Sequence, residues 1–328
     1  MRKYLLSTSA LAGAVLLSSA AIADVSIGGT VEWEMISGDT DNAATDGTSM
    51  TTNNEINIDF TNTTDSGLTI TFNADIDADS TVGANDDNSM SISGGFGKIT
   101  VGKTDGVEDQ MAISADALVA EEHGMSGTLN TNNTIMTATG SQLDGNVNAI
   151  TYMLPSMGGL TAGATYKDSG ANTSTDTTAF GLTYAMEAAG AGITVAYTTA
   201  TTEAATQDSD ATTIGAEVVT NGITFVVNQA TLETAGEDQT GNSFGASYTL
   251  PSGIKLAATT MKAEDDIAAE VGEEYTVNHY ELTYPVASGL SAVISVSDYD
   301  YKVGTGTDAS SKTADSGTIS SFMLKASF

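Results

Sequence analysis

Carboxylates are the residues of this chain whose spacing comes nearest to a recognisable chemical site. Asp75, Asp77, Asp79 and Asp86 fall at positions one, three, five and twelve of a possible calcium-binding loop. Such a loop also requires glycine at position six and glutamate at position twelve, and this segment has Ser80 and an aspartate there. Alternating polar residues are also typical of a β-strand, so a strand that runs into an acidic loop is the main interpretation and calcium the alternative.

The two histidines stand near glutamates, a combination that could bind a metal or transfer a proton. His123 follows Glu121 and Glu122, and His279 lies two residues before Glu281. Neither histidine has a third partner, and the chain has no HExxH motif, no phosphate-binding glycine loop and no nucleophile–histidine–acid set. We therefore expect neither an enzyme nor a resident cofactor, although acidic loops outside the membrane could hold Ca²⁺ or Mg²⁺.

Residues 1–23 have the features of a secretory signal peptide. Arg2 and Lys3 precede an apolar stretch, and the small residues Ala21 and Ala23 mark a cleavage site. The remaining chain, 24–328, holds 8 lysines, no arginine and 42 carboxylates, and 8 minus 42 is a formal charge of −34. Such a charge repels phosphate groups, so we expect no nucleic-acid partner. With no cysteine, this exported chain cannot be stabilised by disulfides.

From residue 25 to the C-terminus, apolar and polar residues alternate. Ile70, Phe72 and Ala74, for example, alternate with polar residues, and the last residues of the chain follow the same pattern. Strict alternation predicts β-strands with one apolar and one polar face. Because no amphipathic helical stretch competes with the strands, the apolar faces must meet either a second sheet or lipid.

The connections between these strands alternate between two lengths. Short turns rich in Gly, Asn, Asp and Pro fall at 63–67, 94–97, 155–159, 187–192, 220–222, 251–253 and 285–289. Long acidic segments fall at about 36–52, 78–87, 104–145, 168–175, 200–210, 233–239, 263–274 and 302–315. Together they predict an all-β fold: a sixteen-stranded antiparallel transmembrane β-barrel with short periplasmic turns and long external loops. Residues 24–328 then form one domain, because no linker supports two soluble β domains.

Aromatic residues give a second indication of a membrane. Those at the short-turn ends of descending strands predict an aromatic row at the inner interface: Phe60, Tyr152, Tyr184, Tyr248, Tyr284 and Phe328. Four others are expected near the tops of ascending strands, where they could begin an outer row: Trp33, Phe72, Tyr166 and Tyr197. Such rows favour lipid over a second sheet as the partner of the apolar faces.

The polar faces of the strands would then line a water-filled lumen. The charged residues expected on this wall are Glu32, Glu34, Glu55, Asp59, Asp75, Asp77, Lys98, Lys167, Lys255 and Lys325. The longest connection, 104–145, is expected to fold into the lumen and narrow it, because a loop of this length usually has a function.

Two segments beside this connection resemble Gram-negative general porins. Residues 94–103, GGFGKITVGK, resemble the strand that precedes the constriction loop of those proteins, and residues 148–160, NAITYMLPSMGGL, resemble the strand and turn that follow it. Phe328 resembles the terminal aromatic residue of the signal read by the outer-membrane assembly machinery. The likeness is greatest to the alphaproteobacterial branch.

The resemblance implies a homotrimer of sixteen-stranded barrels in the outer membrane, in contact with lipid, lipopolysaccharide and the assembly machinery. It also implies passive diffusion of small hydrophilic solutes past an inward third loop. Carried onto this chain, the acidic side of the constriction is Asp105, Glu108, Asp109, Asp116, Glu121 and Glu122. The loop lacks the PEFG core of the family. The usual arginine cluster opposite is also missing, and only Lys98, Lys167, Lys255 and Lys325 could replace it.

A lumen lined mainly by carboxylates should prefer cations. Three alternatives remain open from the sequence. The chain could be a porin selective for cationic nutrients or divalent ions, an outer-membrane barrel enzyme, or an acidic secreted or surface adhesin without a pore.

Overall fold

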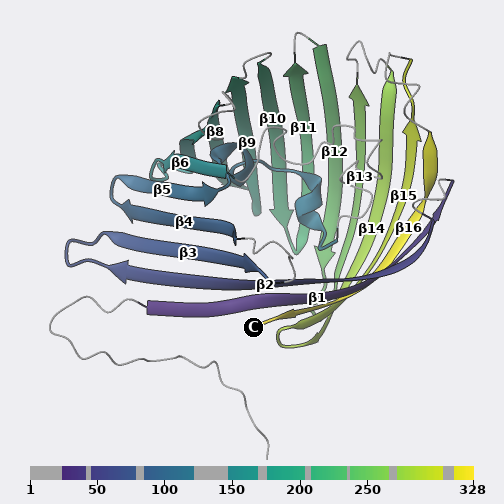
Figure 1. The fold of residues 1–328 in the computed structure, drawn as a ribbon, viewed down its shortest axis with the longest axis horizontal. Helices are drawn as coiled ribbons and strands as arrows, with labels where there is room; N and C mark the ends of the chain where they lie inside the picture. Colours follow the sequence, from purple (N-terminus) through teal and green to yellow (C-terminus); the bar gives the residue numbers. More distant parts are fainter. Residues whose placement is uncertain are drawn as a thin grey trace, which may run out of the picture.

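The computed structural model describes residues 24–41, 46–78, 85–121, 147–168, 176–203, 208–234, 237–265, 272–305 and 314–328. Within these ranges sixteen antiparallel strands form one closed barrel, in which strands adjacent in the sequence pair with one another (Figure 1). The barrel closes between the first strand and the last, where Glu32 lies opposite Lys325 in the register. The predicted signal peptide, 1–23, lies outside the described residues.

The strands have the following bounds. The first eight are β1 (Asp24–Thr40), β2 (Gly47–Thr63), β3 (Thr69–Asp77), β4 (Asn85–Gly94), β5 (Gly97–Thr104), β6 (Val147–Met153), β7 (Leu160–Asp168) and β8 (Asp176–Ala188). The other eight are β9 (Ala191–Glu203), β10 (Ser209–Thr220), β11 (Ile223–Thr234), β12 (Glu237–Thr249), β13 (Lys255–Asp265), β14 (Glu273–Ala287), β15 (Leu290–Lys302) and β16 (Asp315–Ser327).

Two short helical turns, α1 (Val107–Gln110) and the 3₁₀ turn η1 (Ala115–Leu118), follow β5. Across the described ranges, no helix is long and apolar enough to cross a membrane.

The predicted number of strands and their antiparallel pairing are confirmed. One end of the barrel, here called the short-turn end, carries the tight connections. β10 and β11 join through Asn221 and Gly222, which have positive φ values of 48° and 78°. A two-residue turn of this kind matches the right-handed twist of the strands it joins. The opposite end is here called the loop end.

Several connections at the loop end are shorter than the composition suggests. The polar segment 36–52 is predicted as a loop, but β1 continues to Thr40 and β2 starts at Gly47. Likewise β11 runs to Thr234 and β12 starts at Glu237, within the predicted loop 233–239. These predictions are wrong because polar side chains do not end a strand. Backbone hydrogen bonds continue above the lipid, where both faces of the sheet can meet water.

Over most of the wall, the apolar parity points out of the barrel, as predicted. Ile27, Phe180 and Phe244 are 65%, 56% and 64% exposed. All six aromatic residues predicted for the inner row are also exposed. Large exposed apolar side chains over the whole outer wall are expected for a barrel that faces lipid.

The predicted position of Phe72 in an outer aromatic row is wrong. Phe72 lies opposite Phe60 in the β2–β3 register, and their ring centroids are 6.0 Å apart. Phe72 therefore belongs to the aromatic row at the short-turn end. Height on the wall depends on the pairing register, and position along the sequence alone does not give that register.

At the loop end of β13–β15 the polarity of the wall is reversed, so that the inner face is apolar and the outer face is charged. The inward side chains there form one buried apolar cluster of Met261, Ala263, Tyr275, Val277, Tyr299 and Tyr301. The outward side chains include Lys262, Glu274 and Asp300. An apolar inner face with a charged outer face is typical of a sheet that stands in water. The prediction that the apolar parity faces lipid along the whole chain fails here, because these strands extend above the hydrocarbon.

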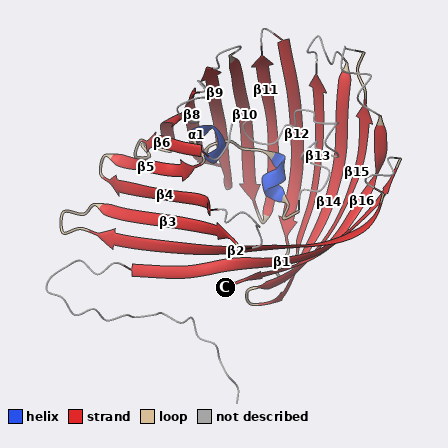
Figure 2. Cartoon of the chain, viewed as in Figure 1, coloured by secondary structure: helices blue, strands red, loops and turns tan. Residues whose placement is uncertain are grey.

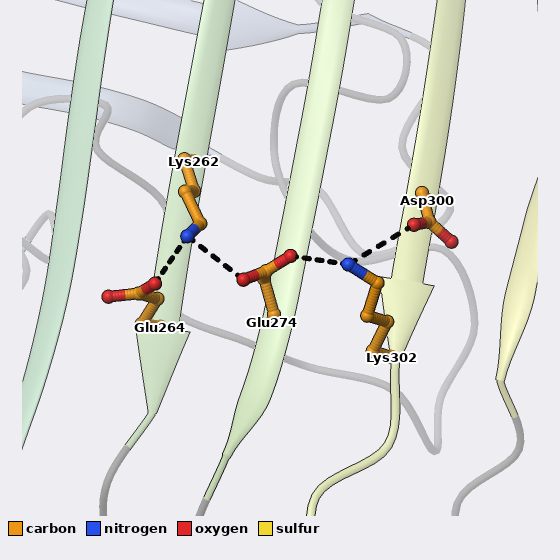
Figure 3. Close-up of polar contacts among 5 residues, drawn as sticks. All are labelled: Lys262, Glu264, Glu274, Asp300 and Lys302. Carbon is orange, nitrogen blue, oxygen red and sulfur yellow. Dashed lines mark hydrogen bonds and ion pairs between the residues drawn. The ribbon is translucent and has the colours of Figure 1, made fainter.

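Outward charges in this region form a continuous chain of ion pairs (Figure 3). Lys262 Nζ contacts Glu264 and lies 2.9 Å from Glu274 Oε2. Lys302 Nζ lies 2.6 Å from Glu274 Oε1 and 3.6 Å from Asp300 Oδ2. Exposed pairs of this kind add little stability singly. These charged side chains instead indicate where the hydrocarbon ends, because charges are unfavourable on the part of the outer wall that faces lipid.

Nitroxide labels on β14 test this boundary, since the chain has no native cysteine. Leu282→Cys and Thr276→Cys place labels on the same outward face, below and above the change of character. In liposomes, power-saturation EPR should find the label at 282 accessible mainly to oxygen and the label at 276 accessible mainly to a water-soluble nickel complex. Equal, lipid-like accessibility at both positions would contradict the boundary.

Candidate pore constriction

The chain that follows β5 enters the barrel and runs along its interior. We call residues 105–121 the inner loop. Its turn α1 contacts β7, β8 and β9, and its turn η1 contacts β11, β12 and β13. Figure 2 shows both turns, in blue, inside the barrel on the side of these strands. The predicted inward fold of 104–145 is thus seen for the described part, and 122–146 lies outside the described residues.

Inward-facing glycines make room for the first half of the inner loop. A β-carbon at Gly163 in β7 would lie 2.7 Å from Val107 Cγ1. A β-carbon at Gly181 in β8 would lie 2.7 Å from Met111 Sδ. Because both distances are shorter than a carbon contact allows, a side chain at either position would displace α1. Val107 and Met111 are buried against the wall at this point.

The second half of the inner loop is seated in the same way. A β-carbon at Gly215 in β10 would collide with the backbone oxygen of Ile113 and lie 2.8 Å from its Cβ. One at Gly245 in β12 would lie 2.9 Å from Leu118 Cδ1. Leu118 is buried, with Ile113 packed beside it. Four glycines on four strands therefore form a track that lets the inner loop lie against the wall.

Backbone N–H groups of the inner loop donate hydrogen bonds to side chains of the wall. Val107 N donates to Thr165 Oγ1 in β7 at 2.9 Å. Ala115 N donates to Ser243 Oγ in β12 at 3.3 Å. These bonds pair polar groups that the packed interior would otherwise leave unsatisfied.

A glutamate holds the far end of the inner loop. Glu281 Oε2 in β14 accepts hydrogen bonds from Ala120 N at 2.7 Å and from Glu121 N at 3.0 Å. His279, two residues away on the same face, is buried, and its Nδ1 lies 2.8 Å from Ser297 Oγ. In this structure the pair noted in the sequence as a possible metal or proton-transfer site anchors a loop and packs the wall.

An ion pair beneath α1 contradicts the expected positions of two charged residues. Glu108 was expected on the acidic side of the pore and Lys167 on the opposite wall. The structure brings the two into direct contact, and their side chains are 0% and 2% exposed. Neither charge is displayed to the lumen. The pairing was not visible in the sequence because it joins residues 59 positions apart.

The other acidic residues of the inner loop are less buried. Asp105, Asp109 and Glu121 are partly exposed. Asp116 is also partly exposed and accepts a hydrogen bond from Ser114. The remaining predicted carboxylate, Glu122, lies outside the described residues, as does His123.

The wall formed by β2 and β3 carries a network of carboxylates bridged by amides. Asn57 Nδ2 donates to Glu55 and, at 2.8 Å, to Asp75 Oδ1. Asn73 Nδ2 donates to Asp59 Oδ1 at 3.1 Å and to Asp75 Oδ1 at 3.3 Å. Amides hold these carboxylates in place without neutralising them. This wall therefore keeps three negative charges close together.

The remaining charged wall residues differ in what they display. Glu32 and Lys325 form an ion pair of 2.6 Å across the β1–β16 seam. Glu34 is buried. Lys98 in β5 is exposed and Lys255 in β13 is partly exposed.

The possible calcium loop is divided by the fold. Asp75 and Asp77 lie in β3, while Asp86 lies in β4. Asp79 and the side chain of Asp86 lie outside the described residues. Within the part of the chain that is described, no group of three or more His, Cys, Asp or Glu side chains could hold a metal ion.

A family model described as Gram-negative porin matches residues 7–316. The chain belongs to this porin family. No curated protein matches the sequence of this porin significantly.

Solved porin structures share the fold at low sequence identity. The anion-selective porin from Comamonas acidovorans has a TM-score of 0.66 and 14% identity, and the match covers 94% of this chain and 100% of that one. The trimer form of OmpT from Vibrio cholerae has a TM-score of 0.67 and 13% identity over 93% and 99% of the two chains. OmpF from Salmonella typhi, in complex with daunomycin, has a TM-score of 0.68 and 15% identity over 93% and 97%. Together with the family match, this fold indicates a multi-pass β-barrel of the outer membrane.

Two features of this porin were missed in the sequence. The glycine track was hidden because its four glycines lie in four different strands, although all four fall on the inward parity. Glu281 was noticed only for its neighbour His279. A carboxylate at an inward position of a barrel strand is a signal for a partner inside the barrel, which here is the backbone of the inner loop.

Gly215→Ala tests the seating of the inner loop. The new β-carbon would overlap the backbone of Ile113, so the loop should shift toward the lumen and single-channel conductance should fall. Overpacking of this kind costs about 1–3 kcal/mol of stability. Gly95→Ala, at a turn with open space around it, is the control and should leave conductance unchanged. Equal conductance in both variants would contradict the seating.

Lys167→Met tests the buried ion pair. Removing the ammonium leaves the Glu108 carboxylate buried without its partner, which should lower the free energy of unfolding by about 3–5 kcal/mol. The double variant Glu108→Gln/Lys167→Met should recover most of that loss, because neither charge then remains. Lys325→Met, which breaks a more exposed pair, should cost at most about 1 kcal/mol. Denaturant unfolding in detergent measures all three variants, and a double variant as unstable as Lys167→Met would refute the assignment.

Proposed function

We propose that the porin forms a water-filled channel for passive diffusion of small hydrophilic solutes and ions, with a preference for cations. The observation that carries this proposal is the division of the lumen into two unlike halves. The inner loop covers the β7–β13 side, where inward side chains such as Thr165, Ser243 and Thr259 are buried. On the β1–β5 side most inward groups are exposed or partly exposed, although Glu34, Thr100 and Thr104 are buried. Water and ions pass along that open side.

The sign of the preference follows from the charges on the open side. The amide-bridged carboxylates Glu55, Asp59 and Asp75 lie there. Lys325 in β16 is paired with Glu32, and Lys167 in β7 is buried with Glu108. The exposed Lys98 in β5 is outnumbered by these three carboxylates. A narrow passage with fixed negative charge concentrates cations and excludes anions.

The barrel alone does not set ion preference. The porin from Comamonas acidovorans shares the fold and is described as anion-selective. The preference proposed for this chain therefore rests on the charges of its own lumen wall, and residues 24–328 contain no arginine that could reverse them.

The proposal extends to assembly and chemistry. OmpT of Vibrio cholerae, which shares the fold, is described in a trimer form, and this supports a homotrimer for the present chain. Contacts with outer-membrane lipid, lipopolysaccharide and the assembly machinery complete the proposed partners. The proposed channel is passive, so it requires neither enzymatic activity nor a resident cofactor.

Reversal potentials in planar bilayers test the cation preference. Under a KCl gradient the wild-type channel should give the sign of a potassium-preferring pore. Neutralising the open wall with Asp59→Asn and Asp75→Asn should lower the permeability ratio of K⁺ to Cl⁻ by about twofold per removed charge. A unit charge about 8 Å from an ion in water contributes about 0.5 kcal/mol, with opposite sign for K⁺ and Cl⁻, so the two ions differ by about 1 kcal/mol. Screening by salt at about 0.1 M roughly halves this difference, which leaves about a twofold change in the ratio.

Lys262→Gln provides the matched control, because Lys262 carries a charge on the outer wall rather than in the lumen. It should leave the reversal potential unchanged. A wild-type reversal potential with the sign of chloride preference would overturn the proposal. If Lys262→Gln changed the reversal potential as much as the wall variants do, the selectivity could not be assigned to the carboxylates of the lumen wall.

A further inference from the structure

A cavity of about 310 Å³ opens from the lumen between the open wall and the start of the inner loop. Its walls come from β3, β4 and β5 and from the inner loop, which contributes Asp105 and Gln110. Every lining side chain is polar. The volume suits a small solute and is too large to be filled by a single water molecule.

Hydroxyl groups dominate the lining of this cavity. Thr71, Ser91 and Thr100 lie on one register row across β3, β4 and β5. Thr151 and Thr165 continue the row beneath the inner loop, where their hydroxyls bond to each other at 2.9 Å. The row is thus covered by the loop on one side and open to solute on the other. Hydroxyls both donate and accept, so they can bond a polar solute of either charge.

Lys98 gives the cavity its one cationic group among the described lining residues. Two other lysines of the lumen wall form ion pairs: Lys167 with Glu108, and Lys325 with Glu32. Lys98 makes no ion pair with any described residue. Lys98 is exposed and lines the cavity, so its charge is available to a solute there.

The charge of the surrounding lumen restricts what can reach Lys98. A simple anion would have to pass the carboxylates of the open wall, which raise its energy throughout the passage. A solute with one carboxylate and one ammonium has no net charge and avoids that cost. Asp105, on the inner-loop side of the same cavity, supplies a partner for the ammonium.

We propose that this cavity is a binding subsite for a small zwitterionic solute, whose carboxylate meets Lys98 and whose ammonium meets Asp105. The hydroxyls of Ser91 and Thr100 replace water around the solute. The inference rests on the proposed channel function and adds a saturable step to it. Small amino acids are the chemical class that this arrangement fits.

Current block by 4-aminobutyrate tests the subsite in the full-length channel. In planar bilayers at low KCl concentration, wild-type current should fall saturably as the zwitterion is added. Erythritol, an uncharged solute of similar size, should lower the current only in proportion to its effect on bulk conductivity. Lys98→Met should weaken the apparent affinity by about tenfold or more, as expected when one charged hydrogen bond is lost.

Two further variants complete the test. Asp105→Asn keeps the shape of the cavity and should weaken block by the zwitterion without creating block by acetate. Lys255→Met removes a lumen-side lysine that does not line the cavity, and it should leave block unchanged. Conducting channels that show no saturable block, or equal effects of Lys98→Met and Lys255→Met, would overturn the subsite alone. The reversal potential of the same membranes reports separately on the proposed channel function.

Discussion

The structure depends on one constraint, which is that no backbone N–H or C=O group can remain unpaired in hydrocarbon. A sheet meets this requirement only by closing on itself, and the pairing of β1 with β16 removes the last free edges. Closure gives every strand an outer and an inner face and so explains the alternation along the chain. The constraint ends where the hydrocarbon ends. There the loop ends of β13–β15 reverse their faces, with tyrosines packed inside and ion pairs outside.

Closure leaves a wide interior, and the inner loop fills part of it. Glycines 163, 181, 215 and 245 remove side chains along the path of the inner loop. Thr165, Ser243 and Glu281 then pair with backbone N–H groups along that path. The charge of Glu108 is neutralised by Lys167 beneath the loop. The acidic inner loop, predicted as one side of the pore, is therefore partly buried against the barrel wall. Negative charge is displayed on both sides, by Asp105, Asp109, Asp116 and Glu121 of the inner loop and by Glu55, Asp59 and Asp75 of the opposite wall.

The sequence predicted features that depend on neighbouring residues, and it missed features that depend on contacts between residues far apart in the chain. Alternation and turn residues are local, and they were sufficient for sixteen strands, the outward aromatic row and the inward parity of Lys98 and Lys325. Register is not local, so the height of Phe72 opposite Phe60 was missed. The burial of Glu108 depends on a lysine in β7, two strands beyond the β5 strand that the inner loop follows. Loop lengths were overestimated because Thr, Ser and Asp side chains are as compatible with a hydrated strand as with a loop.

The central claim is that water and ions pass along the β1–β5 wall and not along the side covered by the inner loop. Single cysteines in this cysteine-free chain, modified by a charged thiol reagent during current recording, test it most directly. Asp59→Cys on the open wall should react quickly and change the current, whereas Thr259→Cys on the covered side should react far more slowly. Equal reaction rates at the two positions would contradict the account.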